Sequence, residues 1–133
     1  MSVRQIVHVI DDDPGVLQSV WLLLFSAGFG VRTYGSALEF LRTIKPGDKG
    51  CVVTDQCMPV MTGIDLLLEV EERDLHLPVI VMSAEADVHL AVRVMKLGAV
   101  DFVAKPFEPE ALIVCVRRAL ANQEFEVGRS AQA

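Results

Sequence analysis

The sequence predicts a single α/β domain in which five strands alternate with five helices. Short apolar runs separate longer segments that have the 3.6-residue period of amphipathic helices. The chain has 133 residues, 52% of them hydrophobic and 23% charged, which is enough to bury a core without disulfide bonds. Its mean hydropathy of +0.42 indicates that some segments are buried on more than one side, as the strands of a parallel sheet are.

Five runs have the composition of strands. Four of them are mostly apolar and rich in β-branched residues, which favours strands covered by helices on both faces. The run at 30–34 has fewer apolar residues than the others, as an edge strand can have. The predicted strands, in chain order, are 6–10, 30–34, 51–54, 79–82 and 100–103.

Segments of helical period lie between these strands, each bounded by a glycine, a proline or a polar turn. Asp13 precedes Pro14 and Gly15, a pattern more typical of a helix cap than of a ligand. After Gln123 the periodicity fades, so we expect a domain at 4–122 and a tail or linker start at 123–133. The predicted helices are 14–27, 36–44, 63–74, 86–97 and 108–121.

Alternating strands and helices are joined by right-handed crossovers, which place helices on both faces of a parallel sheet. We therefore predict a doubly wound, flavodoxin-like α/β fold, (βα)5, with the strand order 2-1-3-4-5. Ligands of such sheets bind beside the carboxyl ends of the strands, where the winding direction reverses. The residues at these strand ends are therefore the candidate site.

Charge and cysteine content exclude several classes of protein. Twelve Lys and Arg against 18 Asp and Glu give a net charge of −6, the wrong sign for a domain that grips nucleic acid by itself. The three cysteines lack zinc or disulfide spacing and are expected to be reduced. No run reaches the roughly 20 apolar residues that span a bilayer, and none resembles a signal peptide. We expect a cytoplasmic protein that does not bind membranes.

Acidic residues dominate the predicted strand ends. Asp11 and Asp12 follow the first strand and Asp55 follows the third. Carboxylates gathered at one edge repel each other by up to about 4 kcal/mol per close pair at an effective dielectric constant near 20. Mg²⁺ prefers oxygen ligands and relieves such repulsion. Although each residue alone could be structural, together with Ser83 and Lys105 they predict a magnesium site with one fixed positive charge.

The same strand ends carry the motifs of a known family. Asp55 begins the string Asp-Gln-Cys-Met-Pro-Val-Met-Thr-Gly, three aspartates follow Ile10, Met and Ala flank Ser83, and Lys105 stands in Val-Ala-Lys-Pro-Phe. Over about residues 5–122 these motifs resemble the receiver domain of bacterial two-component response regulators. The stretch from Ala99 onward looks most like the FixJ-type receivers.

The resemblance implies a role for each of these positions. Asp55 would be the phosphoacceptor, with its carboxylate attacking the phosphohistidine of a sensor histidine kinase. Asp12, Asp55 and the main-chain carbonyl of Cys57 would hold Mg²⁺, while Asp11 would act mainly through water or by orienting Asp12. Lys105 would pair with Asp55 or with a phosphoryl oxygen.

The resemblance also implies a switch. Ser83 would donate its hydroxyl to the attached phosphoryl group and move the loop after the fourth strand. Phe102, three positions before Lys105, would enter the space vacated, although the residue fits an ordinary core aromatic equally well. These movements would change the surface of the fourth helix, fifth strand and fifth helix. The resemblance further implies that Pro106 follows a cis peptide bond.

We therefore expect a phosphorylatable signalling module and not an independent metabolic enzyme. FixJ-type receivers usually precede a helix-turn-helix DNA-binding domain, so the resemblance implies control of transcription through an effector domain absent from this sequence, or through a partner protein. A homodimer that forms on phosphorylation through the fourth and fifth helices is also compatible with it.

Three alternative functions fit the sequence less well. A phosphorylation-independent docking scaffold would not need the complete set of site residues. A phosphatase of the haloacid dehalogenase type needs a second aspartate where Cys57 stands. A flavin module needs a loop rich in Ser, Thr and Gly where this chain has three aspartates.

Other polar or reactive residues are predicted to be structural. Cys57 has no flanking base, so we expect a buried or half-buried thiol without redox chemistry. His8, His76 and His89 follow no metal or phosphotransfer pattern, and we expect all three to be structural.

Overall fold

A computed structural model describes residues 5–85 and 87–132 of the chain. Within these residues five strands alternate with five helices, as the sequence predicts. The elements are β1 (Ile6–Ile10), α1 (Pro14–Ser26), β2 (Gly30–Tyr34), α2 (Ala37–Thr43), β3 (Cys51–Asp55), α3 (Gly63–Glu72), β4 (Val79–Ser83), α4 (Val88–Lys96), β5 (Asp101–Ala104) and α5 (Pro109–Gln132).

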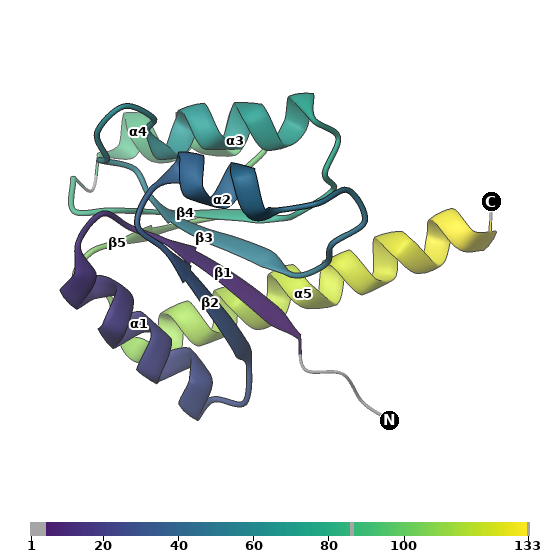
Figure 1. Ribbon diagram of the computed structural model, residues 1–133, viewed down its shortest axis with the longest axis horizontal. Coiled ribbons are helices and arrows are strands. Elements are labelled where there is room, and N and C mark those ends of the chain that lie inside the picture. Colours follow the sequence, from purple (N-terminus) through teal and green to yellow (C-terminus); the bar gives the residue numbers. More distant parts are fainter. Residues whose placement is uncertain (1–4, 86, 133) are drawn as a thin grey trace.

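All strand pairs are parallel, and the order in the sheet is β2-β1-β3-β4-β5. Helices α2, α3 and α4 cover one face of the sheet, and α1 and α5 cover the other (Figure 1). The predicted doubly wound fold and strand order are therefore confirmed. The chain reverses its winding direction between β1 and β3, where Ile10 pairs with Thr54. The residues that follow this pair, Asp11 and Asp55, lie side by side at the reversal point.

Two apolar clusters hold the helices against the sheet. One includes Phe40 and Leu66 on the face covered by α2, α3 and α4. The other includes Leu24 and Leu112 on the face covered by α1 and α5. Every residue of β3 and β4 is buried, which explains why these strands read as continuous apolar runs. Full burial of each such aliphatic side chain contributes about 1.5–3 kcal/mol, so the strand ends are held on a rigid core.

Helix α5 differs from its prediction. It continues to Gln132, beyond the predicted end at 121, because Ala, Gln, Glu and Arg in this stretch favour a helix even where the apolar period fades. The Gln123 side chain also fixes the helix to the loop before β3: its amide nitrogen donates to the Gly50 carbonyl at 2.9 Å, and its oxygen accepts the Gly50 N–H at 3.2 Å. A domain boundary near 122 remains a prediction.

Gly50 can hold this position because it has no side chain. Its φ is 119°, and a Cβ atom there would lie 2.3 Å from the main-chain oxygen of Ile6. Any other residue would push β1 and β3 apart at their amino ends. Among the helices of the described residues, none has both the length and the apolar character needed to cross a membrane.

Candidate functional site

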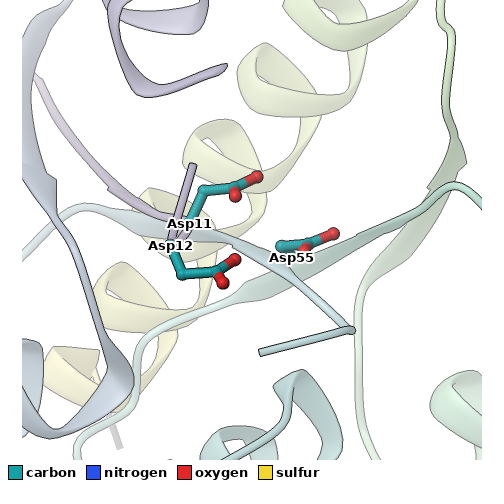
Figure 2. Close-up of side chains that lie close together, drawn as sticks. All are labelled: Asp11, Asp12 and Asp55. Atoms are coloured by element: carbon teal, nitrogen blue, oxygen red, sulfur yellow. The ribbon is translucent and has the colours of Figure 1, made fainter. Parts of the chain in front are cut away.

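Three carboxylates meet at the carboxyl ends of β1 and β3 (Figure 2). One oxygen from each of Asp11, Asp12 and Asp55 lies within 4.8 Å of the others. Asp11 and Asp55 are buried, with 1% and 7% of their surfaces exposed, whereas Asp12 is exposed. The side-by-side register of β1 and β3 therefore brings together the acidic residues that the sequence predicts to meet.

Lys105 supplies the positive charge of this cluster. Its Nζ lies 2.9 Å from Oδ2 of Asp11 and 3.0 Å from Oδ1 of Asp55. The residue follows β5, and its main-chain N–H donates to the Ser83 carbonyl at 2.8 Å, which fixes its backbone to the end of β4. The Lys105–Pro106 peptide bond is cis, as the resemblance implies.

Burial and charge act in opposite directions on these groups. Burial raises the pKa of Asp55, and the neighbouring charges of Asp11 and Asp12 raise it further, against the lowering effect of Lys105. Burial alone would lower the pKa of Lys105, but its hydrogen bonds to Asp11 and Asp55 outweigh burial and raise it. The ammonium is therefore held in its charged form between two carboxylates, and the cluster retains an excess of negative charge.

The main chain holds Asp11 in place. Its N–H donates to the Tyr34 carbonyl at 3.2 Å, and its Oδ1 accepts the N–H of Asp13 at 3.0 Å. Asp13 in turn caps α1 by accepting the N–H of Gly15 at 2.9 Å. Asp13 is therefore a helix cap, as predicted.

Carboxylate oxygens around a small space are the ligands that Mg²⁺ prefers. The exposed side chain of Asp12 is open to an ion that keeps several of its waters. Asp11 already binds Lys105 through one oxygen and the Asp13 N–H through the other, which fits an indirect role. The donor set of this cluster therefore fits magnesium.

Two predicted switch residues lie outside the carboxylate cluster. The hydroxyl of Ser83, which is fully buried, accepts the N–H of Glu85 at 3.1 Å and donates to its carbonyl at 3.4 Å. Phe102 is half-buried and packs against the core cluster beneath α2, α3 and α4. In this state Ser83 is bonded to its own loop.

The prediction of a buried or half-buried Cys57 is wrong, because Cys57 is exposed. The residue lies in the surface loop between β3 and α3 and does not extend the buried strand. Its remaining burial, together with the negative charges of Glu85 and Asp55, raises the pKa of the thiol. A thiol that resists ionisation is a poor nucleophile.

Gln56 makes contacts that the sequence does not predict. Its side-chain oxygen accepts the N–H of Ile64 at 2.9 Å, and its main-chain carbonyl accepts the N–H of Gly63 at 3.1 Å. The residue therefore joins the end of β3 to the first turn of α3. The only signal in the sequence is an amide side chain directly after β3, and this signal is too common to be specific.

Comparisons with known proteins agree with this geometry. Residues 7–117 match the response regulator receiver domain family. The chain is 48% identical over 127 residues to the transcriptional regulatory protein FixJ of Azorhizobium caulinodans, covering 96% of this chain and 60% of that protein. It is 36% identical over 115 residues to the response regulator protein TodT of Pseudomonas putida, covering 86% and 51%. The chain thus spans between half and two thirds of the length of these relatives.

Solved structures give the same result. The response regulator StyR superposes with a TM-score of 0.89 at 37% identity, covering 98% of this chain and 66% of that one. Full-length FixJ from B. japonicum superposes with a TM-score of 0.87 at 39% identity, covering 98% and 64%. With the family match extending over most of the described sheet and helices, the chain belongs to the response regulator receiver domain family and is a receiver similar to those of FixJ and TodT.

Proposed function

We propose that this receiver accepts a phosphoryl group on Asp55 from the phosphohistidine of a sensor histidine kinase. The observation that carries the proposal is the pairing of Lys105 with Asp55 and Asp11, with Asp12 within 4.8 Å of both carboxylates. An oxygen of Asp55 forms a bond to phosphorus while the bond between phosphorus and the histidine nitrogen breaks, and the electron pair of that bond leaves with the imidazole. The product is an acyl phosphate on Asp55.

The residues around Asp55 have separate tasks in this transfer. Asp12, Asp55 and the main-chain carbonyl of Cys57 would hold Mg²⁺, and Asp11 would orient this set from its buried position. When bound, the ion neutralises charge on the phosphoryl oxygens during in-line transfer. Lys105 opposes the effect of burial on the pKa of Asp55 before the transfer and would face the phosphoryl group afterwards, because its Nζ lies 3.0 Å from an Asp55 oxygen.

The switch would follow from the new negative charge on Asp55. Ser83 would exchange its bonds to the Glu85 main chain for a bond to a phosphoryl oxygen, and Phe102 would move into the space left by the loop. The surface of α4, β5 and α5 would then differ between the unphosphorylated and phosphorylated states. A partner that binds one of these states more tightly would respond to phosphorylation. We propose that this surface contacts the effector domain that controls transcription. The same surface would form the dimer of phosphorylated receivers.

The direct test is phosphorylation of this chain by acetyl phosphate with and without Mg²⁺, followed by intact-protein mass spectrometry. We expect the mass of one phosphoryl group to be added only when Mg²⁺ is present. Asp55→Asn should abolish the addition. Asp13→Asn is the matched control, because it removes a neighbouring carboxylate that caps α1 and asparagine also caps helices. An acyl phosphate that still forms on Asp55→Asn would overturn the assignment.

A further inference from the structure

We propose that Gln56 is a positioning residue for the magnesium site: its side-chain amide fixes the loop between β3 and α3, which carries Cys57 beside the carboxylates. This inference rests on the proposed function, because it assumes that the Cys57 carbonyl is a metal ligand. It assigns a task to a residue whose side chain bonds to the first turn of α3.

Gln56 closes the loop by three hydrogen bonds. Its main-chain N–H donates to the Met82 carbonyl at 2.8 Å, which fixes the start of the loop to β4. Its carbonyl accepts the N–H of Gly63 at 3.1 Å, and its side-chain oxygen accepts the N–H of Ile64 at 2.9 Å. The side-chain bond therefore ties the two ends of the loop together, since Gln56 begins the loop and Ile64 lies in the first turn of α3.

Helix α3 approaches the strand end too closely for a side chain at Gly63. A Cβ atom there would lie 2.8 Å from the Asp55 carbonyl oxygen and 2.9 Å from the Gln56 side-chain oxygen. The main chain of the phosphoacceptor, the Gln56 amide and the start of α3 therefore form one packed unit. Displacement of the Gln56 side chain would displace the peptide units on either side of it, and the next unit along the chain holds the Cys57 carbonyl.

The loop between these ends is strained. Val60 has a φ of 70°, a left-handed conformation that is unusual for a β-branched residue. The N–H of Met61 donates to the Pro59 carbonyl at 2.7 Å, which makes Val60 the centre of a three-residue turn of the strained type. Such a conformation persists only when the surrounding structure holds it. The hydrogen bonds made by Gln56 help to hold the loop, and with it Val60, in this conformation.

Cys57 follows Asp55 by two residues, at the carboxyl end of β3. A loop tied in this position presents the carbonyl of Cys57 to the metal without having to be ordered first. A loop that lacks the tie would have to be ordered when the ion binds. The cost of that ordering would appear as weaker Mg²⁺ binding.

The chain offers a matched control for this test. Gln123 makes the same kind of bond, from a side-chain amide to the main chain, but at Gly50, which precedes β3 instead of following it. We expect Gln56→Met to raise the dissociation constant for Mg²⁺ by about threefold to tenfold, the factor that corresponds to one lost hydrogen bond. Gln123→Met should leave it unchanged. Isothermal titration of both variants with MgCl₂ measures this. Equal affinities for Gln56→Met and the unmodified chain, or equal weakening by both substitutions, would overturn the inference.

A second measurement does not depend on the folding of any variant. Because coupling between two events is reciprocal, saturating Mg²⁺ should slow hydrogen exchange of the Ile64 amide in the unmodified chain and leave the Gly50 amide unaffected. Unchanged exchange at Ile64 would overturn the inference even if Gln56→Met failed to fold. Asp12→Asn separates the two proposals. If it binds Mg²⁺ as tightly as the unmodified chain, the proposed function itself fails, whereas a normal loss with Asp12→Asn and no effect of Gln56→Met refutes only the role of Gln56.

Discussion

The ammonium of Lys105 lies 3.0 Å from a carboxylate oxygen of Asp55, so a residue that follows β5 reaches across β4 to the end of β3. The same nitrogen lies 2.9 Å from Asp11. One cation thus serves two buried carboxylates, and Asp12 adds a third negative charge within 4.8 Å of them. This excess of negative charge determines how substitutions at the site should change the stability of the metal-free domain.

Removal of the cation should destabilise the metal-free domain. Lys105→Met deletes two charge-assisted hydrogen bonds, and we expect the free energy of unfolding to fall by about 1–3 kcal/mol near neutral pH. Mg²⁺ should restore more stability to this variant than to the unmodified chain, because the ion then neutralises charge that Lys105 no longer balances. Urea unfolding with EDTA or with MgCl₂ measures both effects. Lys96→Met, at an exposed position of α4, is the control; equal losses from the two substitutions would contradict the prediction.

Asp55 should make the domain less stable as it ionises. Burial raises its pKa above the ordinary value of 3.8, so the folded state binds the proton more tightly than the unfolded chain does, and stability is lost as the pH rises from 3.8 through the folded-state pKa. Asparagine is neutral at every pH. Asp55→Asn should therefore be more stable than the unmodified chain near neutral pH in EDTA, and the difference should shrink as the solution is acidified. Urea unfolding over this range tests it, and a variant less stable near neutral pH would show that the bond to Lys105 outweighs burial.

His8 should cause the opposite pH dependence. Its Nδ1 lies 3.0 Å from the Tyr34 hydroxyl, and burial, helped by the positive charge of Arg32, lowers its pKa below 6.5 against the opposing effects of the Lys49 carbonyl and Asp48. The unfolded chain takes up the proton first, so stability is lost as the pH falls from 6.5 through the folded-state pKa.

The variant His8→Gln removes this titration. We expect its unfolding free energy to depend less steeply on pH in that range, by up to about 1.4 kcal/mol per pH unit. Substitution of the exposed His89 by glutamine should leave the slope as it is. Parallel slopes for His8→Gln and the unmodified chain would mean that His8 titrates normally in the folded state.

Glycine should relieve the strain at Val60. The left-handed conformation costs a residue with a Cβ atom about 1–2 kcal/mol, and Val60 is 90% exposed, so few contacts are lost with its side chain. Val60→Gly should raise the unfolding free energy by about 1 kcal/mol, after allowance for the greater freedom of glycine in the unfolded chain. Val60→Ala keeps the Cβ atom and should gain less. If the backbone were not strained, thermal and urea unfolding would show Val60→Gly to be less stable than Val60→Ala, because glycine has more freedom in the unfolded chain.

Alternating composition was sufficient to predict the fold. The apolar runs at β3 and β4 identify strands buried on both faces, and Asp13, Ser36 and Thr62 cap helices where the sequence changes period. The extension of α5 to Gln132 could not be predicted from apolar period, because that period fades after Gln123 while the backbone propensity of the residues still favours a helix.

Part of the candidate site could likewise be predicted from the sequence, and part could not. Asp11, Asp12, Asp55 and Lys105 could be predicted because the carboxyl ends of parallel strands meet at one edge. The exposure of Cys57 could not be predicted, and neither could the hydrogen bond from the Ile64 N–H to the Gln56 side chain. Both depend on the path of a loop. That path is set by a left-handed valine and by the close approach of Gly63, and neither leaves a pattern in hydropathy.

The helices differ in how firmly they are anchored. Helix α3 buries Gly63, Ile64, Leu66, Leu67 and Val70, whereas α4 buries Val94 alone. A helix that gives up little apolar contact can be displaced at small energetic cost. Ser83 ends the strand that precedes α4, so a movement of Ser83 of the kind proposed above would meet little resistance from the adjacent helix, and α4 could shift while β3 stays in place.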